Sequence, residues 1–253
     1  MLSKLFFLVV LVCVFSINTL AQPSEKLPEL LKLIQPSVVT IKTFDSQGRL
    51  LKEASGFFVS YRHIITNKHV IDGFYSAEVT TLDGYRCPVT EYLESPNENM
   101  DLVKLTVELP ENETVDTKIC PGTVVNSLPS VGQKVIVIGN PQGLGQTVSD
   151  GIVSGIRNIE NVGTFIQLTA PISQGSSGSP VFNMDGDIIG IATFYIKDGQ
   201  NLNFAIPATE VVKLFNEEDG EWQEFDRAYR HLLMESPPTK PAAKKQIVKR
   251  DKK

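Results

Sequence analysis

The sequence predicts an all-β protein, an antiparallel barrel or sandwich with a short N-terminal helix and C-terminal helices. Two observations predict this fold class. Short β-type runs separated by turn residues follow one another from Ser37 to Pro207, and no long helical pattern interrupts them. With 253 residues, 42% of them hydrophobic, the chain suits one large domain or two small lobes around a buried core.

The predicted helices lie at the two ends of the β-rich region. Residues 24–35 repeat leucine at helical spacing and the pattern stops at Pro36, which predicts a short amphipathic helix. The spacing becomes helical again at residues 208–217 and 221–234, and the second of these segments contains Trp222. We therefore expect a C-terminal helix at 219–235 after the folded domain.

The β-type runs fall into two groups, expected to form lobes at about 37–108 and 123–207. A segment at 109–122 with prolines and a glycine connects the groups. Each run combines β-branched or aromatic residues with flanking turn residues, as strands do. The runs are 37–44, 55–60, 63–71, 76–82, 100–107, 134–140, 147–156, 164–170, 179–196 and 202–207.

The first 21 residues are typical of a secretory signal peptide. Lys4 precedes an apolar stretch of about 11 residues, and the small Ala21 stands at the predicted cleavage point before Gln22. An uncleaved anchor is the alternative, but a helix needs about 20 apolar residues to span a bilayer. We expect an exported protein, in the bacterial periplasm or otherwise secreted, whose mature domain covers residues 22–218.

The charge distribution is asymmetric. Residues 236–253 hold seven basic residues and one acid, so removing this tail and Lys4 from the net charge of −5 leaves −12 for residues 22–235. An acidic body argues against nucleic-acid binding. The basic tail is typical of disorder, and contact with an anionic envelope surface is the alternative.

The cysteines and histidines do not predict a metal site. Cys87 and Cys120 remain in the mature chain, either as one disulfide bridge or, as we favour, as two separate buried thiols. Neither these cysteines nor His63, His69 and His231 follow a ligand spacing. We expect no metal and no cofactor, and structural roles for His63 and His231.

The segment "QGSSGSP" at 174–180 is the candidate turn that holds a nucleophilic serine. A serine hydroxyl needs a base and inward-pointing backbone N–H groups, and glycine beside the serine allows such a backbone. The α/β-hydrolase elbow does not fit, because residue 179 is serine and no strand–helix alternation surrounds it. A flexible linker does not fit either, since β-type runs flank both sides.

Candidate partners for this serine lie in the first lobe. His69 follows an alternating apolar strand, and a strand end can present an imidazole to a second lobe. Asp101 stands at the start of another alternating strand and is the candidate carboxylate that orients the histidine. Asp72 and Asp83 are better explained as turn residues. The order His69, Asp101, Ser177 matches the chymotrypsin-type order of a catalytic triad.

The motifs resemble the HtrA/Deg branch of trypsin-like serine proteases. The similarity covers residues 27–216, and no PDZ domain, which family members use for substrate capture, follows it. The resemblance implies two six-stranded antiparallel β-barrels with the active site in the cleft between them. The matching segments are "SGFFVS", "HIITNKHVI", "MDLVKLTV", "VIVIGNPQGLGQTVSDGIVSGI", "QGSSGSPVFNMDGDIIGI" and "NFAIP".

The resemblance also implies roles for individual residues. Ser177 is the expected nucleophile, His69 the general base and then acid, and Asp101 the orienter, with the backbone N–H groups of Gly175 and Ser177 as oxyanion hole. The expected substrate-binding residues are Pro171, Thr193, Phe194 and Tyr195.

Two serines depart from the protease pattern. Ser179 replaces a usual glycine, and Ser176 replaces the buried aspartate of the digestive proteases, so activation by a newly cut N-terminus is not expected.

The expected function is therefore that of an exported serine endopeptidase acting on unfolded or extended polypeptides, in envelope protein quality control. A catalytically silent binding or chaperone-like module with the same fold is the alternative. Pro171 offers no charge for a basic side chain, so small or medium aliphatic residues are the expected preference before the scissile bond. Trimers are common in the family, and a homo-oligomer is a further expectation.

Overall fold

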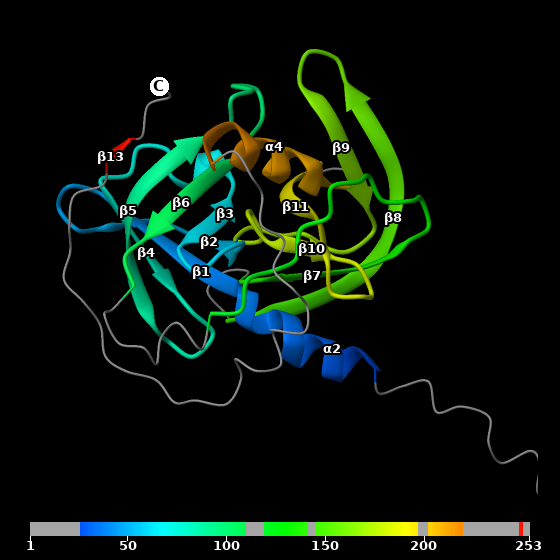
Figure 1. The fold of residues 1–253 in the computed structure, drawn as a ribbon, viewed down its shortest axis with the longest axis horizontal. Helices are drawn as coiled ribbons and strands as arrows, with labels where there is room; N and C mark the ends of the chain where they lie inside the picture. Colours follow the sequence, from blue (N-terminus) through cyan, green and yellow to red (C-terminus); the bar gives the residue numbers. More distant parts are fainter. Residues whose placement is uncertain (1–25, 110–118, 141–144, 197–201, 220–247, 250–253) are drawn as a thin grey trace, which may run out of the picture.

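The computed structural model describes residues 26–109, 119–140, 145–196, 202–219 and 248–249. Two β-barrels lie side by side, as Figure 1 shows, with the first coloured blue to green and the second green to yellow. The predicted signal peptide and the predicted helix at 219–235 lie outside the described residues, apart from residue 219. The predicted fold of two six-stranded antiparallel barrels is confirmed.

The first barrel contains β1 to β6. Its strands are ordered β5-β4-β1-β2-β3-β6, and pairing of β5 with β6 closes the barrel. Buried and half-buried residues alternate along β4, so one face of this strand fills the barrel. Ile41, Phe58 and Ile64 are among the fully buried core residues. The bounds are β1 Val38–Phe44, β2 Leu50–Phe58, β3 His63–Thr66, β4 Ser76–Thr80, β5 Arg86–Glu94 and β6 Val103–Val107.

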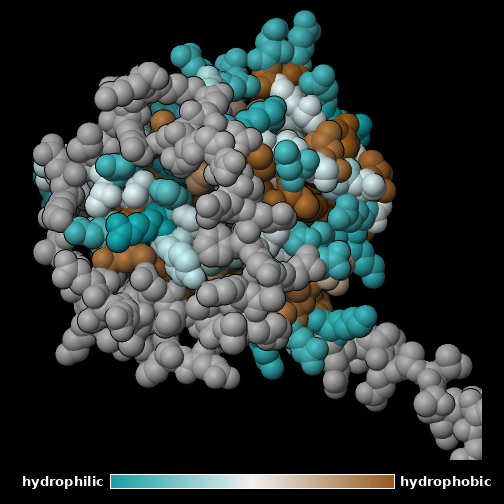
Figure 2. Space-filling model, in the orientation of Figure 1, coloured by the Kyte–Doolittle hydropathy of each residue, from teal (hydrophilic) through white to brown (hydrophobic). Residues whose placement is uncertain are grey.

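The second barrel contains β7 to β12, closed in the order β10-β11-β12-β9-β8-β7. Val153, Leu168 and Val181 are fully buried in its core. Figure 2 shows hydrophobic residues scattered among hydrophilic ones on its surface, and Ile152 and Ile159 of β8 are among those exposed. The bounds are β7 Lys134–Gly139, β8 Thr147–Ile159, β9 Gly163–Leu168, β10 Pro180–Phe182, β11 Ile188–Tyr195 and β12 Asn203–Pro207.

Two helices pack where the barrels meet, one on each side in Figure 1. The predicted N-terminal helix is α2, Lys26–Ile34, and a 3-10 turn at Gln35–Ser37 leads from it into β1. The helix predicted at 208–217 is α4, Ala208–Asp219. Apolar residues of both helices join one buried cluster with residues from both barrels, including Phe57 and Ile136. This shared cluster fixes the two barrels relative to each other.

Within the predicted tail at 236–253, the structure describes only Val248–Lys249. These residues form a short strand, β13, which pairs in parallel with β5 at Glu91 and Tyr92. The rest of the tail, and the prediction of its disorder, lie outside the described residues. Among the described helices, none is long and apolar enough to cross a membrane.

Cys87 and Cys120 are both buried and are not joined by a disulfide bridge, as the sequence analysis favoured. Burial, together with the nearby carboxylates of Asp83 and Glu78, raises the pKa of Cys87 to about 12. The thiol therefore stays uncharged and behaves as a small apolar side chain of the first barrel's core.

Candidate active site

His69 and Asp101 meet because they flank neighbouring strands of the first barrel. β3 and β6 pair antiparallel with Thr66 opposite Val103, so the residues after β3 and before β6 reach the same barrel edge. His69 lies in the 3-10 turn Lys68–Val70 that follows β3. Its backbone N–H donates to Asp101 Oδ1 at 2.8 Å, and its Nδ1 lies 2.6 Å from Asp101 Oδ2.

The Asp101 carboxylate decides which imidazole nitrogen carries the proton. Burial raises the pKa of Asp101, but hydrogen bonds from His69 and Thr193 and the charge of His69 outweigh it, so the pKa lies below its ordinary value of 3.8. Thr193 Oγ1 in the second barrel donates to Asp101 Oδ2 at 3.0 Å. An ionised carboxylate only accepts hydrogen bonds, so His69 Nδ1 is the donor and Nε2 is left to accept a proton.

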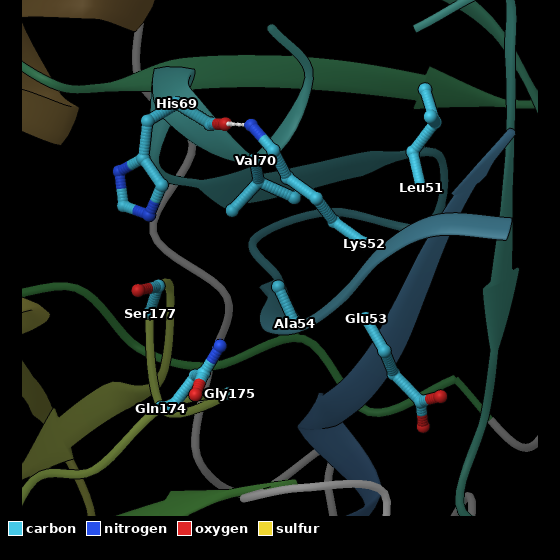
Figure 3. A pocket seen from close by; sticks show the side chains of 9 residues that line it. All are labelled: Leu51, Lys52, Glu53, Ala54, His69, Val70, Gln174, Gly175 and Ser177. Atoms are coloured by element: carbon cyan, nitrogen blue, oxygen red, sulfur yellow. Dashed lines mark hydrogen bonds between the residues drawn. The ribbon is translucent and has the colours of Figure 1, made fainter. Parts of the chain in front are cut away.

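Ser177 lies at the tip of two consecutive turns between β9 and β10. Ser176 N–H donates to the carbonyl of Ser173 at 2.9 Å, and Ser179 N–H donates to that of Ser176 at 3.0 Å. Gly175 and Gly178 have φ angles of +92° and +81°, values that a residue with a Cβ rarely adopts. Figure 3 shows the Ser177 hydroxyl on the same side of the pocket as the imidazole of His69, below the ring.

The buried Ser55 of the first barrel holds this loop. Its N–H donates to the Ser177 carbonyl at 2.9 Å, and its hydroxyl donates to the Gly175 carbonyl at 2.9 Å. The same hydroxyl accepts the Asn140 N–H at 2.8 Å. Two carbonyls of the loop are therefore oriented by a strand of the opposite barrel.

The buried Asn67 makes a second connection between the barrels. Its Oδ1 accepts the Gly178 N–H at 2.7 Å, and its Nδ2 donates to the Asp101 carbonyl at 2.8 Å. One side chain thus ties the residue after Ser177 to the backbone of Asp101.

The N–H groups of Gly175 and Ser177 donate to no residue in the described ranges. A histidine that a carboxylate orients, lining one cavity with a serine hydroxyl, is an arrangement able to carry out acyl transfer. In the described part of the chain, no group of three or more His, Cys, Asp or Glu side chains is placed to hold a metal.

A surface cavity of about 410 Å³ contains His69 and Ser177. The remaining lining comes from β2, from the turn carrying His69 and from the loop carrying Ser177: Leu51, Lys52, Glu53, Ala54, Val70, Gln174 and Gly175.

Pro171, Thr193 and Phe194, three of the four residues expected to bind substrate, do not line this cavity. Thr193 is buried against Asp101, and the exposed Phe194 stacks on Phe204 with ring centroids 4.8 Å apart. Pro171 is exposed, and its carbonyl accepts the hydroxyl of Ser149 at 3.0 Å. The backbone of Tyr195 pairs with Asn203 in β12. Their roles in substrate binding stay predictions.

Two other sequence features are placed by the structure. His63 contacts Ser60 and the ring of Phe215, and it does not line the cavity; His231 lies outside the described residues. Ser179 is fully buried, and its hydroxyl has no hydrogen-bond partner in the described ranges. A Cβ at Gly139 would lie 2.0 Å from that hydroxyl, so the Ser179 side chain occupies the space that is open because Gly139 has none.

Comparison with known proteins decides the family. Residues 54–191 match the trypsin-like peptidase domain family. The chain belongs to this family. The predicted resemblance to HtrA-type proteases is also confirmed by relatives and by solved structures.

The periplasmic serine endoprotease DegP of Salmonella typhimurium is 34% identical over 174 residues, which are 66% of this chain and 34% of that protein. The serine protease Do-like HtrA of Bacillus subtilis is 29% identical over 228 residues, 78% of this chain and 49% of that protein. This trypsin-like chain therefore spans a third to a half of the length of these curated relatives.

Among solved structures, the serine endoprotease from Yersinia pestis superposes with a TM-score of 0.66 at 28% identity, covering 79% of this chain and 70% of that one. An HtrA-type protease with a tripeptide superposes with a TM-score of 0.64 at 26% identity, covering 77% of this chain and 64% of that one.

Proposed function

We propose that this chain is an exported serine endopeptidase that hydrolyses peptide bonds in extended or unfolded polypeptides. Ser177 is the nucleophile, His69 the general base and acid, and Asp101 the orienting carboxylate. The observation that carries the proposal is the 2.6 Å contact between His69 Nδ1 and Asp101 Oδ2, because the same His69 lines a cavity together with Ser177.

The reaction follows from these positions. Ser177 Oγ attacks the substrate carbonyl while His69 Nε2 takes its proton, and the resulting oxyanion accepts the N–H groups of Gly175 and Ser177. The C–N bond breaks as His69 returns the proton to the leaving amine, which leaves an acyl ester on Ser177. Water deprotonated by His69 then hydrolyses the ester and restores the hydroxyl.

The substrate is proposed to pair as an extra strand along β11 at Thr193 to Tyr195. β12 occupies one edge of β11 there, and pairing with β10 on the other edge involves Ile188 to Ile191 only. Pro171 and Phe194 favour small or medium aliphatic residues before the scissile bond. A cleavage profile dominated by lysine or arginine would contradict that preference.

The cellular setting is proposed from two supports. The N-terminal 21 residues have signal-peptide character, and relatives such as the Salmonella DegP are named periplasmic. We place the protein in the bacterial envelope, in protein quality control, with trimer formation and contact of the basic tail with an anionic surface as further parts of the proposal.

A fluorophosphonate probe tests the activity, because the probe forms a covalent bond only with an activated serine. The full chain should be labelled and should degrade unfolded casein, and Ser177→Ala should do neither. Ser179→Ala is the matched control and should still be labelled, since Ser179 is buried away from the cavity. Absence of Ser177-dependent labelling with substrate present would favour the silent binding module.

A further inference from the structure

The cavity beside Ser177 is lined mainly by residues of β2 and of the turn that carries His69. His69 lines it, and in the proposed reaction His69 delivers a proton to the leaving amine. Thr193 and Phe194, along which the preceding substrate residues are proposed to pair, do not line it. In the proposed reaction, the substrate residues that follow the scissile bond would therefore be the ones that enter this cavity.

Lys52 provides a positive charge at this place. Its side chain runs past Val70, as Figure 3 shows, and Nζ donates to the backbone carbonyl of His69. An ammonium group has three donors, so a neutral carbonyl leaves two of them and the charge available. No carboxylate of the described residues lies within ion-pair distance of Lys52.

Glu53 lines the same cavity but its charge is already balanced. Lys42 Nζ lies 3.5 Å from Glu53 Oε2, and Asn140 Nδ2 donates to Oε1 at 2.8 Å. Successive residues of a strand point to opposite faces, and Figure 3 shows the Glu53 carboxylate directed away from Lys52. The remaining β2 lining, Leu51 and Ala54, is apolar.

We propose that Lys52 makes this cavity a subsite for an acidic substrate residue, an aspartate or glutamate shortly after the scissile bond. The carboxylate takes the two donors that the His69 carbonyl leaves, and the stem of the residue packs on Leu51 and Val70. This inference rests on the proposed peptidase activity and adds to it a preference for an acidic residue after the scissile bond.

Matched peptides test the subsite. A cleavage site is first mapped in unfolded casein by mass spectrometry, and quenched fluorescent peptides are built on it with Glu, Gln or Lys at each of the first three positions after the cut. The full chain should cleave the best Glu peptide about fivefold faster in kcat/KM than its Gln counterpart, and the ratio should shrink at high salt.

Lys52→Met should bring the Glu-to-Gln ratio to about one, and Lys52→Glu should favour the Lys peptide. The ratio is insensitive to any overall loss of activity that the altered His69 contact causes. Lys68→Met is the matched control, since Lys68 is next to His69 in the chain but pairs with Glu94 and does not line the cavity. This variant should keep the wild-type ratio.

The outcomes separate the two proposals. Equal cleavage of the Glu, Gln and Lys peptides at every position, by a protein that the fluorophosphonate probe labels, overturns the Lys52 subsite and leaves the peptidase proposal intact. A ratio that survives in Lys52→Met also overturns the subsite. Absence of Ser177-dependent labelling overturns the peptidase proposal and the subsite together.

Discussion

The two barrels contribute to the candidate site in different physical ways. The first barrel supplies side chains, since His69 and Asp101 flank paired strands and bond directly to each other. The second barrel supplies a backbone shape, in which turns with Gly175 and Gly178 at positive φ carry Ser177. The contribution of the first barrel depends on which side chains are present, and that of the second depends on a loop conformation that requires glycine.

The loop of the second barrel is held by its own turns and also by residues of the first barrel. Ser55 and Asn67 of the first barrel bond to backbone groups of Gly175, Ser177 and Gly178. In the other direction, Thr193 alone of the described second-barrel side chains bonds to the Asp101 carboxylate. The barrel that carries Ser177 therefore takes part of its loop geometry from the other barrel.

The largest expected effect tests the first barrel. Asp101→Asn should lower kcat by about 10⁴-fold, because a neutral amide cannot hold the proton on His69 Nδ1 or stabilise the imidazolium. Fluorophosphonate labelling rates and peptide hydrolysis measure the loss. A decrease below tenfold would show that the contact at 2.6 Å does not orient the base.

The same variant has a pH signature in stability. Because the pKa of Asp101 is lowered in the folded state, its stabilisation is complete above the unfolded pKa and is lost as pH falls through the folded pKa. The amide that replaces this carboxyl group in the variant cannot titrate, so the variant's free energy of unfolding should fall less steeply between neutral and acidic pH. Urea unfolding at several pH values gives the comparison.

The next effect tests the backbone of the second barrel. Gly178→Ala would place a Cβ 2.1 Å from the Ser55 carbonyl oxygen and 2.2 Å from Thr66 Oγ1, at a φ of +81°. We expect the free energy of unfolding to fall by about 3–5 kcal/mol, together with loss of labelling at Ser177. Urea denaturation followed by circular dichroism measures it.

Gly132→Ala is the matched control for the cost of φ alone. Gly132 has a φ of +90°, but a Cβ there would have nothing within 4 Å. This variant should lose only about 1–2 kcal/mol and keep its activity. If both variants lost the same stability, the close contact between the barrels would not be what restricts the loop.

The sequence pointed to the proposed catalytic residues but not to the residues that hold their loop, and the reason is physical. His69, Asp101 and Ser177 each have a local signal, a strand end or a glycine-flanked serine, and the structure brings them to one edge between the barrels. Ser55 and Asn67 have no such signal. Their bonds to the loop span 120 and 111 residues of chain, and only the packing of the barrels creates them.

Long-range pairing also limited what the sequence could predict about the fold. Strand β5, Arg86–Glu94, was not among the predicted runs, because Pro88 and several polar residues interrupt its alternation, and β6 closes against it through long-range pairing. β2 begins at Leu50, five residues before the predicted run, since the intervening Lys52 and Glu53 obscure the apolar pattern. Those two hidden residues line the cavity at the site.

The smallest effect tests the dependence of the loop on the opposite barrel. Ser55→Ala removes the donor to the Gly175 carbonyl and the acceptor of the Asn140 N–H. Leaving such buried groups unpaired costs about 1–3 kcal/mol, so we expect that loss of unfolding free energy and a decrease in kcat of about 10- to 100-fold with KM little changed.

A peptide aldehyde distinguishes a positioning role for Ser55 from a merely structural one. In the proposed mechanism, the aldehyde forms an adduct with Ser177 whose oxygen uses the N–H groups of Gly175 and Ser177, whereas ground-state substrate binding does not depend on them. Inhibition should weaken in Ser55→Ala by the same factor as kcat, and Ser55→Thr, which keeps the hydroxyl, should recover part of it. Equal weakening of aldehyde and substrate binding would mean that Ser55 only stabilises the fold, and the second barrel would then shape its own loop.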